Sequence, residues 1–477
     1  MQTSCLIDGQ WVGADSGETV DVLNPATDEV IASVPLMGGV ETERAIAAAF
    51  KAWDAWKART AEDRGKLLSA LADAMLRDAD RLAALMTAEQ GKPLAEAKGE
   101  ITYAASFLSW AAEEGKRMYG EIVPASSPGK RILVLRQSVG VAAIITPWNF
   151  PAAMITRKLG PALAAGCPVV IKPSEQTPLS ALAIADLAVR VGIPAGVVNV
   201  VTGHSKPIGE AMLGDDRVRK LSFTGSTGVG RILMRGAANH LLRLSLELGG
   251  HAPFIVFDDA DLDGAVAAAI ACKFRNAGQT CICANRFIVQ DGIYDAFIAR
   301  FGAAIKELKV GEGTGKDVKV GPLINDDAVT KVEEQIADAR SKGGKVPVGG
   351  QRVRIEGLTD RFYAPTLVEG MTPDMKMFRE ETFGPVAPVC RFKDEDEAIR
   401  LANDSEFGLA AYFFTQNASR LIRVAERLEY GIIGANDGGP STAQAPFGGV
   451  KHSGFGREGG KYVMDEYTEL KYVSWGL

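Results

Sequence analysis

The chain has 477 residues, more than one hydrophobic core usually supports, and this length predicts two or three packed domains. Its composition, 47% hydrophobic and 23% charged, is that of an ordinary globular protein. A net charge of -6 gives no basic surface for nucleic acid, and the lack of a membrane-spanning apolar run or a leader-like N-terminus predicts a cytoplasmic protein.

Cysteine and histidine usage argues against disulfides and metal. Six cysteines in so long a chain do not make a disulfide framework, so reduced thiols are expected. The four histidines have no close pairs and no metal-ligand spacing, and we therefore expect no metal site.

Predicted helices come first along the chain. Between residues 41 and 110, apolar residues such as Ile46, Ala49 and Trp53 recur at three- and four-residue steps, which is typical of helices packed on one face. Branched apolar runs at 132–135, 139–145 and 169–171 predict strands. Helices at 180–191, 208–213 and 228–238 then alternate with strands at 197–201 and 220–223. This alternation predicts a doubly wound parallel sheet, which binds ligands beyond the carboxyl ends of its strands.

A second α/β segment is predicted to open with a strand at 254–257, to continue through a helix at 264–274 and to run to about residue 430. Residues 469–475 again have the pattern of a strand. Because this strand follows all the catalytic candidates, we expect it to pair with a distant segment or with another subunit.

Cys281 is the first candidate for chemistry. It ends the segment Phe274-Arg275-Asn276-Ala277-Gly278-Gln279-Thr280-Cys281, in which a Gly-containing turn presents the thiol instead of an apolar run burying it. Taken alone, a cysteine near a glycine is more often a small buried apolar residue than a nucleophile.

Glu247 and Asn149 are two further candidates. Glu247 lies among leucines just before a glycine pair, where desolvation would raise its pKa toward that of a general base; a salt bridge or a helix cap is an equal alternative. Asn149 lies in the turn Thr146-Pro147-Trp148-Asn149-Phe150-Pro151, directly after a predicted strand. Its amide could donate to an oxyanion, although an Asn in such a turn more often satisfies backbone groups.

These three patterns, in this order and at these separations, resemble the aldehyde dehydrogenase superfamily over nearly the whole chain. The resemblance implies a Rossmann-type NAD-binding domain (1–116 and 138–249), an α/β catalytic domain (250–463) and a small β extension for oligomerisation (117–137 and 464–477), in a homodimer or homotetramer. It also implies that Cys281 attacks the aldehyde while Asn149 and the Cys281 N–H stabilise the oxyanion. Glu247 would then activate the water that hydrolyses the thioester.

No G-x-G-x-x-G stands at a predicted strand-to-helix turn, so the common dinucleotide-binding fingerprint is missing and another phosphate site is needed. The resemblance supplies one. The turn at Gly225 and Ser226 opens a helix whose N-terminus would face the pyrophosphate. A carboxylate at Glu175 would bind ribose hydroxyls and repel a 2′-phosphate, so we expect NAD in preference to NADP. The other implied cofactor contacts are Thr146, Pro147, Trp148, Lys172, Ser174, Leu248, Glu381 and Phe383.

The substrate is narrowed by stretches at 153–158, 273–276, 281–283 and 446–451, which resemble the succinate semialdehyde dehydrogenase branch. In that branch two arginines and a serine hold the far carboxylate of the substrate, and the matching positions are Arg157, Arg275 and Ser441. Arginine suits this role because its planar fork binds a carboxylate bidentately. Without the resemblance both arginines would be interpreted as ordinary ion pairs, and Thr442 could take the place of Ser441. The same pocket could accept glutarate semialdehyde or a sulfonated or phosphonylated aldehyde.

Three alternatives stay open. Cys283 could form a regulatory disulfide with Cys281, although one intervening residue strains such a bridge, or it could be an inert neighbour. The chain could be a catalytically silent structural relative, against which the presence of every catalytic residue type argues. It could also form a thioester without redox chemistry, against which the cofactor signals at Lys172, Glu175 and Gly225 argue.

Overall fold

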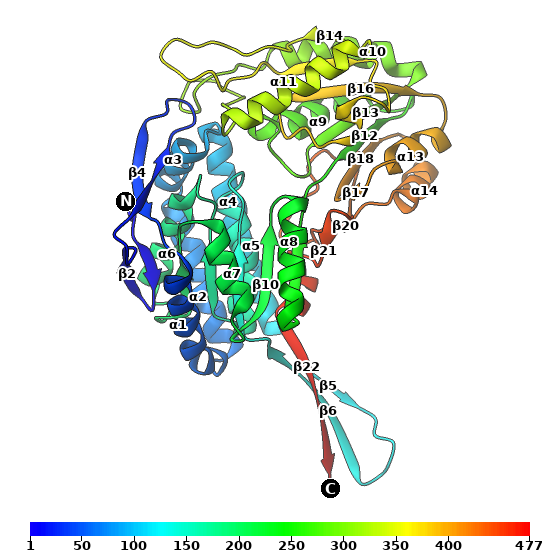
Figure 1. Ribbon diagram of the computed structural model, residues 1–477. Coiled ribbons are helices and arrows are strands. Elements are labelled where there is room, and N and C mark those ends of the chain that lie inside the picture. The colour runs from blue at the N-terminus through cyan, green and yellow to red at the C-terminus, as the bar shows by residue number, and fades with distance from the viewer.

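The computed structural model describes residues 1–477 and contains two large sheets, a third sheet of three strands and two sheets of two strands each (Figure 1). Four short strands open the chain: β1 (Cys5–Ile7), β2 (Gln10–Val12), β3 (Thr19–Leu23) and β4 (Val30–Pro35). The sequence analysis did not predict these strands, which are three to six residues long.

Helices follow, as predicted for residues 41–110. They are α1 (Gly39–Lys57), α2 (Ala61–Arg77), α3 (Ala79–Gln90) and α4 (Leu94–Glu114). Thr60 caps α2 by accepting a hydrogen bond from the Asp63 N–H, and Gly91, at φ 90°, ends α3 in the left-handed conformation. The turn at Gly91 and Lys92 therefore lies between two well-defined helices.

The first sheet has the strand order β2-β1-β9-β8-β7-β10-β11-β21. Its parallel centre consists of β7 (Val141–Ile145), β8 (Val169–Lys172), β9 (Val198–Val200), β10 (Val218–Thr224) and β11 (Arg243–Glu247). The connecting helices are α5 (Ala153–Ala165), α6 (Pro178–Arg190), α7 (Ser205–Gly214) and α8 (Thr227–Ala237). The predicted doubly wound sheet is thus confirmed, and its strand order reverses between β7 and β10.

One predicted strand was wrong in its extent. Residues 139–145 do not form a single strand, because Gly140 adopts φ +130° and separates β6 (Lys130–Ser138) from β7. The run at 132–135 belongs to β6, which lies in the third sheet with β5 (Glu121–Val123) and β22 (Thr468–Gly476). β22 pairs with β6 along its whole length, from Thr468 opposite Ser138 to Gly476 opposite Lys130. The tail strand therefore pairs with a distant segment of the same chain, and this sheet projects from the body of the molecule (Figure 1).

The second sheet has the order β14-β15-β16-β13-β12-β18-β19 and is parallel except for β14 at its edge. Its strands are β12 (Ala252–Val256), β13 (Ala284–Gln290), β14 (Lys345–Val348), β15 (Thr366–Glu369), β16 (Val386–Phe392), β18 (Ala410–Phe414) and β19 (Ile432–Ala435). The helices are α9 (Leu262–Phe274), α10 (Asp291–Lys306), α11 (Asp326–Ser341), α12 (Lys376–Arg379), α13 (Glu395–Asn403) and α14 (Ala418–Arg427). The predicted strand at 254–257 and helix at 264–274 correspond to β12 and α9.

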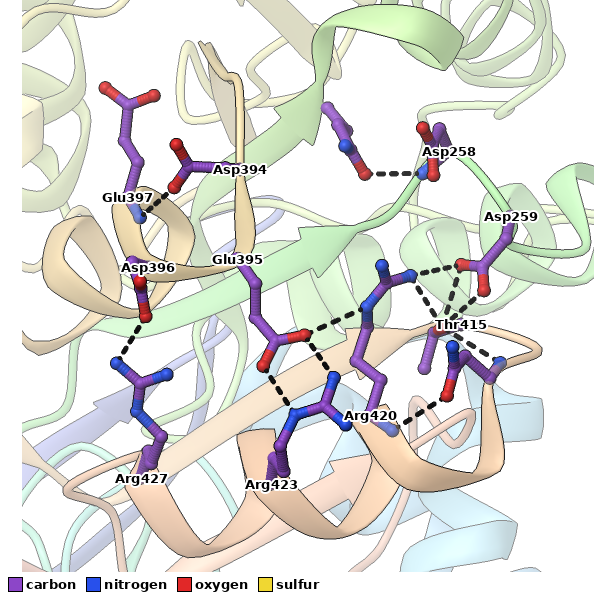
Figure 2. Close-up of polar contacts among 12 residues, drawn as sticks. Asp258, Asp259, Asp394, Glu395, Asp396, Glu397, Thr415, Arg420, Arg423 and Arg427 are labelled. Atoms are coloured by element: carbon purple, nitrogen blue, oxygen red, sulfur yellow. Dashed lines mark hydrogen bonds and ion pairs between the residues drawn. The ribbon is translucent and has the colours of Figure 1, made fainter.

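Arginines on α14 connect this helix to α13 and to the loop after β12 (Figure 2). Arg423 forms two hydrogen bonds to Glu395 at the start of α13, at 3.0 and 2.8 Å. Arg420 bonds the same carboxylate at 3.2 Å and reaches Asp259, in the loop after β12, at 2.9 Å. A shared carboxylate between two guanidinium groups fixes α13 and α14 to the sheet more firmly than separate surface pairs would.

Short strands near the C-terminus join the two halves. β20 (Val450–Lys451) pairs with β17 (Phe407–Gly408), and β21 (Gly454–Phe455) extends the first sheet beside β11. Short 3-10 helices are η1 (Gly115–Arg117), η2 (Ala238–His240), η3 (Arg275–Gly278) and η4 (Tyr462–Glu466). None of the helices combines the length and the apolar character needed to span a bilayer.

Candidate active site

The carboxyl ends of three neighbouring strands bring the candidate residues together. The turn from Thr146 to Asn149 follows β7, Gly225 and Ser226 follow β10, and Glu247 is the last residue of β11. Because β7 and β10 are the strands between which the order reverses, their ends leave an opening that neither connecting helix covers.

The turn that carries Cys281, residues 275–281, is named the nucleophile turn after the candidate role of Cys281. Its backbone is unusual. After α9, Asn276 and Ala277 adopt the left-handed conformation at φ 51° and 55°. Gly278 follows at φ +73°, where a Cβ would lie 2.2 Å from the Gly384 carbonyl oxygen, so only glycine fits. This tight turn ends α9 and delivers Cys281 in front of β13, and conformations of this cost persist mostly at functional sites.

Cys281 lies where two cavities meet. The first cavity, of about 310 Å³, is lined by side chains from α4, α5 and the nucleophile turn, and the second, of about 350 Å³, by the ends of β7, β10 and β11. Only Cys281 and Met154 line both. A group bound in either cavity would therefore reach the same thiol.

Burial raises the pKa of the Cys281 thiol to about 12, although Arg157 opposes the shift. Glu381 and Glu247 act in the same direction as burial, because their negative charges disfavour a thiolate. The thiol is therefore protonated at neutral pH in this state, and its attack on a carbonyl requires a proton acceptor.

Glu247 is 2% exposed, and neither of its carboxyl oxygens has a hydrogen-bond partner. Burial, followed by the neighbouring charge of Glu458, raises its pKa well above the usual value. The shift has the direction that the sequence analysis expected, and Glu247 forms neither a salt bridge nor a helix cap. In this conformation Glu247 lines neither cavity, and a Cβ at Gly448 would lie 2.8 Å from its Oε1.

Asn149 is held against the nucleophile turn. Its Nδ2 donates to the Gln279 carbonyl oxygen at 3.0 Å, which uses one of the two amide hydrogens. Its side-chain oxygen has no partner, and Asn149 lines the second cavity together with Cys281. The amide thus satisfies a backbone carbonyl, as the alternative interpretation expected, and keeps a second hydrogen free for a ligand.

All three predicted substrate residues line the first cavity. Arg157, on α5, is 1% exposed, and its Nη2 has no hydrogen-bond partner. Its Nε lies 2.9 Å from Glu458, so the alternative of an ion pair is present in part. Arg275 forms no ion pair and lies over the Phe150 ring at 5.4 Å, and Ser441 hydrogen-bonds to the Tyr103 hydroxyl.

Seven of the eleven predicted cofactor residues line the second cavity. Of the predicted cofactor residues it is lined by Pro147, Trp148, Gly225, Ser226, Leu248, Glu381 and Phe383. Ser226 caps α8 by accepting from the Val229 N–H, so that the positive end of this helix faces the cavity. Gly249 borders it closely, since a Cβ there would lie 3.1 Å from Glu381 Oε2. Thr146 is buried behind the lining, with its hydroxyl unpaired.

Lys172, Ser174 and Glu175 lie outside the lining of both cavities, at the end of β8. Lys172 Nζ lies 2.9 Å from Glu175 and 2.7 Å from the Ser205 hydroxyl, which donates to Glu175 at 2.6 Å. Burial alone would raise the pKa of Glu175, but Lys172 and Ser205 hold it below the usual value. The carboxylate is thus ionised at neutral pH.

Cys283 is turned away from the cavities. Its thiol donates to the Gly278 carbonyl oxygen at 3.2 Å and lies 3.6 Å from Lys273 Nζ, and both Cys281 and Cys283 are free. A Cys281–Cys283 disulfide would break these contacts, and it stays a prediction. No three histidine, cysteine or carboxylate side chains are placed to hold a metal ion.

Sequence reasoning missed several residues of the site. Lys92, Glu96, Glu100 and Tyr103 line the first cavity, and Asp327 and Lys331 line the second. The one available signal was Glu100, a carboxylate at an apolar position of the helical repeat, since charged residues are seldom fully buried without a partner.

Comparison with known proteins agrees with this geometry. Residues 11–473 match the model of the aldehyde dehydrogenase family. A succinate-semialdehyde dehydrogenase [NADP(+)] from Escherichia coli is 56% identical, over 99% of this chain and 97% of its own length. A glutarate-semialdehyde dehydrogenase from Pseudomonas aeruginosa is 57% identical (98% and 97%), and a 3-sulfolactaldehyde dehydrogenase from Pseudomonas putida is 53% identical (100% and 97%).

A crystal structure of an E. coli NADP-dependent enzyme superimposes with a TM-score of 0.98 at 56% identity, covering 100% of this chain and 98% of that one. The fold is therefore that of the aldehyde dehydrogenases. The chain belongs to the aldehyde dehydrogenase family, and its activity is that of an NAD(P)-dependent aldehyde dehydrogenase.

Proposed function

We propose that this enzyme oxidises a small anionic aldehyde to its acid, with succinate semialdehyde as the preferred substrate. The observation that carries the proposal is the first cavity, in which Arg157, Arg275 and Ser441 lie on the wall of a space that ends at Cys281. A guanidinium group with an unpaired, buried Nη2 has a strong preference for a carboxylate ligand. The three relatives are named for aldehydes that carry an acidic group, which supports this class of substrate.

The proposed reaction begins when Cys281 Sγ attacks the aldehyde carbon and its proton leaves to a base. Asn149 Nδ2 and the Cys281 N–H stabilise the oxyanion of the resulting thiohemiacetal. The residues that line the second cavity would hold a nicotinamide dinucleotide, which would supply the hydride acceptor needed to bring the aldehyde carbon to the oxidation level of a Cys281 thioester. Glu247 then takes a proton from a water molecule that attacks the thioester, the acid leaves, and Cys281 recovers its proton.

Chain length and the nature of the anionic group are the finer alternatives. Glutarate semialdehyde needs one more methylene in the same cavity, and a sulfonated or phosphonylated aldehyde would place a tetrahedral anion against the same arginines. Two of these alternatives correspond to the aldehydes for which relatives are named.

Variants of Arg157 and Arg275 test the anionic substrate. Alanine at either position should lower kcat/KM for succinate semialdehyde by roughly ten- to a hundredfold, because a charge-assisted hydrogen bond contributes about 1.5–3 kcal/mol. Turnover of butanal, which has the same length and no charge, should change little. Arg275 lies close to Cys281 in the sequence. If its replacement damaged the nucleophile turn, kcat/KM would fall for both aldehydes together. Equal losses on both aldehydes would refute the anionic substrate.

For the cofactor, we propose a preference for NAD over NADP. The ionised Glu175 beside Lys172 supports it, because a carboxylate at the ribose repels a 2′-phosphate. The E. coli relative, by contrast, carries NADP(+) in its name. Glu175→Ala should shift the ratio of kcat/KM values toward NADP by about tenfold, the size of one lost charge interaction. An unchanged ratio would remove Glu175 from the ribose site.

We propose the third sheet as the oligomerisation extension, which the sequence analysis predicts at residues 117–137 and 464–477. Ile122, Leu470, Tyr472 and Trp475 lie on it with 58–79% of their surface exposed, which favours burial against another subunit. Sedimentation of the full chain tests this, because a species of 50.7 kDa alone would contradict the predicted homodimer or homotetramer.

A further inference from the structure

A buried ion pair lies beside the predicted oxyanion donor. Lys92, in the turn between α3 and α4, and Glu100, on α4, form an ion pair whose side chains are each 1% exposed. Both residues line the first cavity, and the Lys92 ammonium lies 4.0 Å from the centre of the Phe150 ring. Neither residue belongs to the predicted catalytic, cofactor or substrate set.

The pair connects two elements of the active site. Lys92 Nζ donates to the Asn149 carbonyl oxygen at 2.8 Å. Glu100 Oε1 accepts from the N–H groups of Ala152 and Ala153 at 3.0 and 3.2 Å, and thereby satisfies the first turn of α5. One ion pair therefore holds both the backbone of Asn149 and the start of the helix that carries Arg157.

The Asn149 carbonyl is one corner of a closed set of hydrogen bonds. Asn276 Nδ2 donates to it at 2.9 Å and to the Gln279 carbonyl oxygen at 3.3 Å. Asn149 Nδ2 donates to that same Gln279 oxygen. The amide of Asn149 is thus fixed relative to the turn of Cys281 from both its backbone and its side chain, and Lys92 is the only charged donor in the set.

Lys92 is itself anchored from the other half of the molecule. The Leu94 N–H donates to the Gly313 carbonyl oxygen at 2.9 Å, and a Cβ at Gly313 would lie 2.5 Å from the Lys92 carbonyl oxygen. The segment after Gly313 also reaches the nucleophile turn, since the Ile324 N–H donates to Gln279 Oε1 at 2.9 Å. The segment 313–324 therefore contacts both the turn of Lys92 and the side chain of Gln279.

Stability alone does not account for such a pair. Removing two ions from water costs several kcal/mol, and replacing a buried ion pair with apolar groups is often neutral for stability. A rigid donor–acceptor geometry, by contrast, is what an oxyanion site needs, because its donors must be oriented before the charge develops.

We propose that Lys92, held by Glu100, is a positioning residue that sets the orientation of the Asn149 amide toward the thiohemiacetal oxyanion. The inference rests on the proposed role of Asn149. It predicts that Lys92 acts through Asn149 and independently of the charge on the substrate, although both residues of the pair line the substrate cavity.

A double-mutant cycle tests the proposal in the full-length enzyme. Lys92→Met should lower kcat by about ten- to a hundredfold, part of what loss of a whole oxyanion donor costs, with a small change in KM and equally for succinate semialdehyde and butanal. In the Asn149→Ala background the same substitution should cost less than about twofold, because residues that act through one another are not additive. Lys98→Met, at an exposed position on α4, serves as the control and should leave kcat unchanged.

The outcomes separate the two levels of the assignment. An Asn149→Ala enzyme with normal kcat would contradict the proposed role of Asn149 itself. A slow Asn149→Ala enzyme together with additive losses in the double variant, or with a normal Lys92→Met enzyme, would overturn only the positioning role. A selective loss on succinate semialdehyde would also overturn it, by making Lys92 a ligand of the substrate anion.

Lys92→Met leaves Glu100 buried without its partner, and this can destabilise the fold. A second variant separates such a loss of folding from a loss of catalysis. Lys92→Met/Glu100→Gln removes both charges and keeps an acceptor for the Ala152 and Ala153 N–H groups, so its Tm should return toward that of the parent. The proposal requires kcat to stay low in this folded variant. Recovery of kcat together with Tm would show that the pair is structural only.

Discussion

Replacing Cys281 with alanine is expected to lower aldehyde-dependent NADH formation by ~10⁴-fold or more, because no other group can form the covalent adduct. Cys281 is the one nucleophile that lines both cavities, and the other five cysteines are buried away from them. The loss should appear in kcat, measured by NADH absorbance, with any of the anionic aldehydes as substrate.

Cofactor binding gives the control for this variant. NAD should stabilise Cys281→Ala in a thermal-shift titration as it stabilises the parent, since the thiol is not a cofactor ligand. Cys390→Ala removes a buried sulfur from β16 of the second sheet and should keep its turnover. Appreciable NADH formation by Cys281→Ala, or a loss of turnover in Cys390→Ala of the same size, would contradict the assignment of the nucleophile.

Replacing Glu247 with glutamine is expected to separate the two halves of the reaction. The first turnover should still release NADH in a burst, whereas steady-state kcat should fall by roughly 10²–10⁴-fold, the usual contribution of a general base. Stopped-flow absorbance resolves the two phases, and mass spectrometry of the quenched enzyme should show the acyl group on Cys281. If the burst disappears together with the steady state, Glu247 serves the first step instead.

The pH dependence of the burst and of steady turnover supplies a second measurement on Glu247. Burial and Glu458 raise the pKa of Glu247, so a larger fraction of the group is protonated at a given pH than for an exposed carboxyl. A base acts only when deprotonated, and steady turnover of the parent should therefore rise with pH through this raised pKa. In Glu247→Gln that rise should be absent. An identical pH profile in parent and variant would assign the titration to another group.

Local features of the sequence carried much of the fold. The helices of residues 41–110 follow from apolar residues at three- and four-residue steps, and the strands from β7 to β10 follow from short runs of apolar residues. Both patterns depend only on neighbours along the chain. The same holds for the candidates themselves, because a glycine turn before Cys281 and a carboxylate among leucines at Glu247 are visible without contacts. The short strands β1 to β4 and the break at Gly140 were not predicted from these local patterns.

The proposed reacting groups were therefore found from the sequence alone, through residue types in short patterns. Their arrangement was decided by the tertiary structure. Only the tertiary structure shows that two cavities meet at Cys281, that Glu247 lines neither of them, and that β22 pairs with β6. Lys92 and Glu100 show the reason. Their bonds to Asn149 and to α5 join residues about fifty positions apart, and such contacts arise from the packing of whole elements, which no local periodicity encodes.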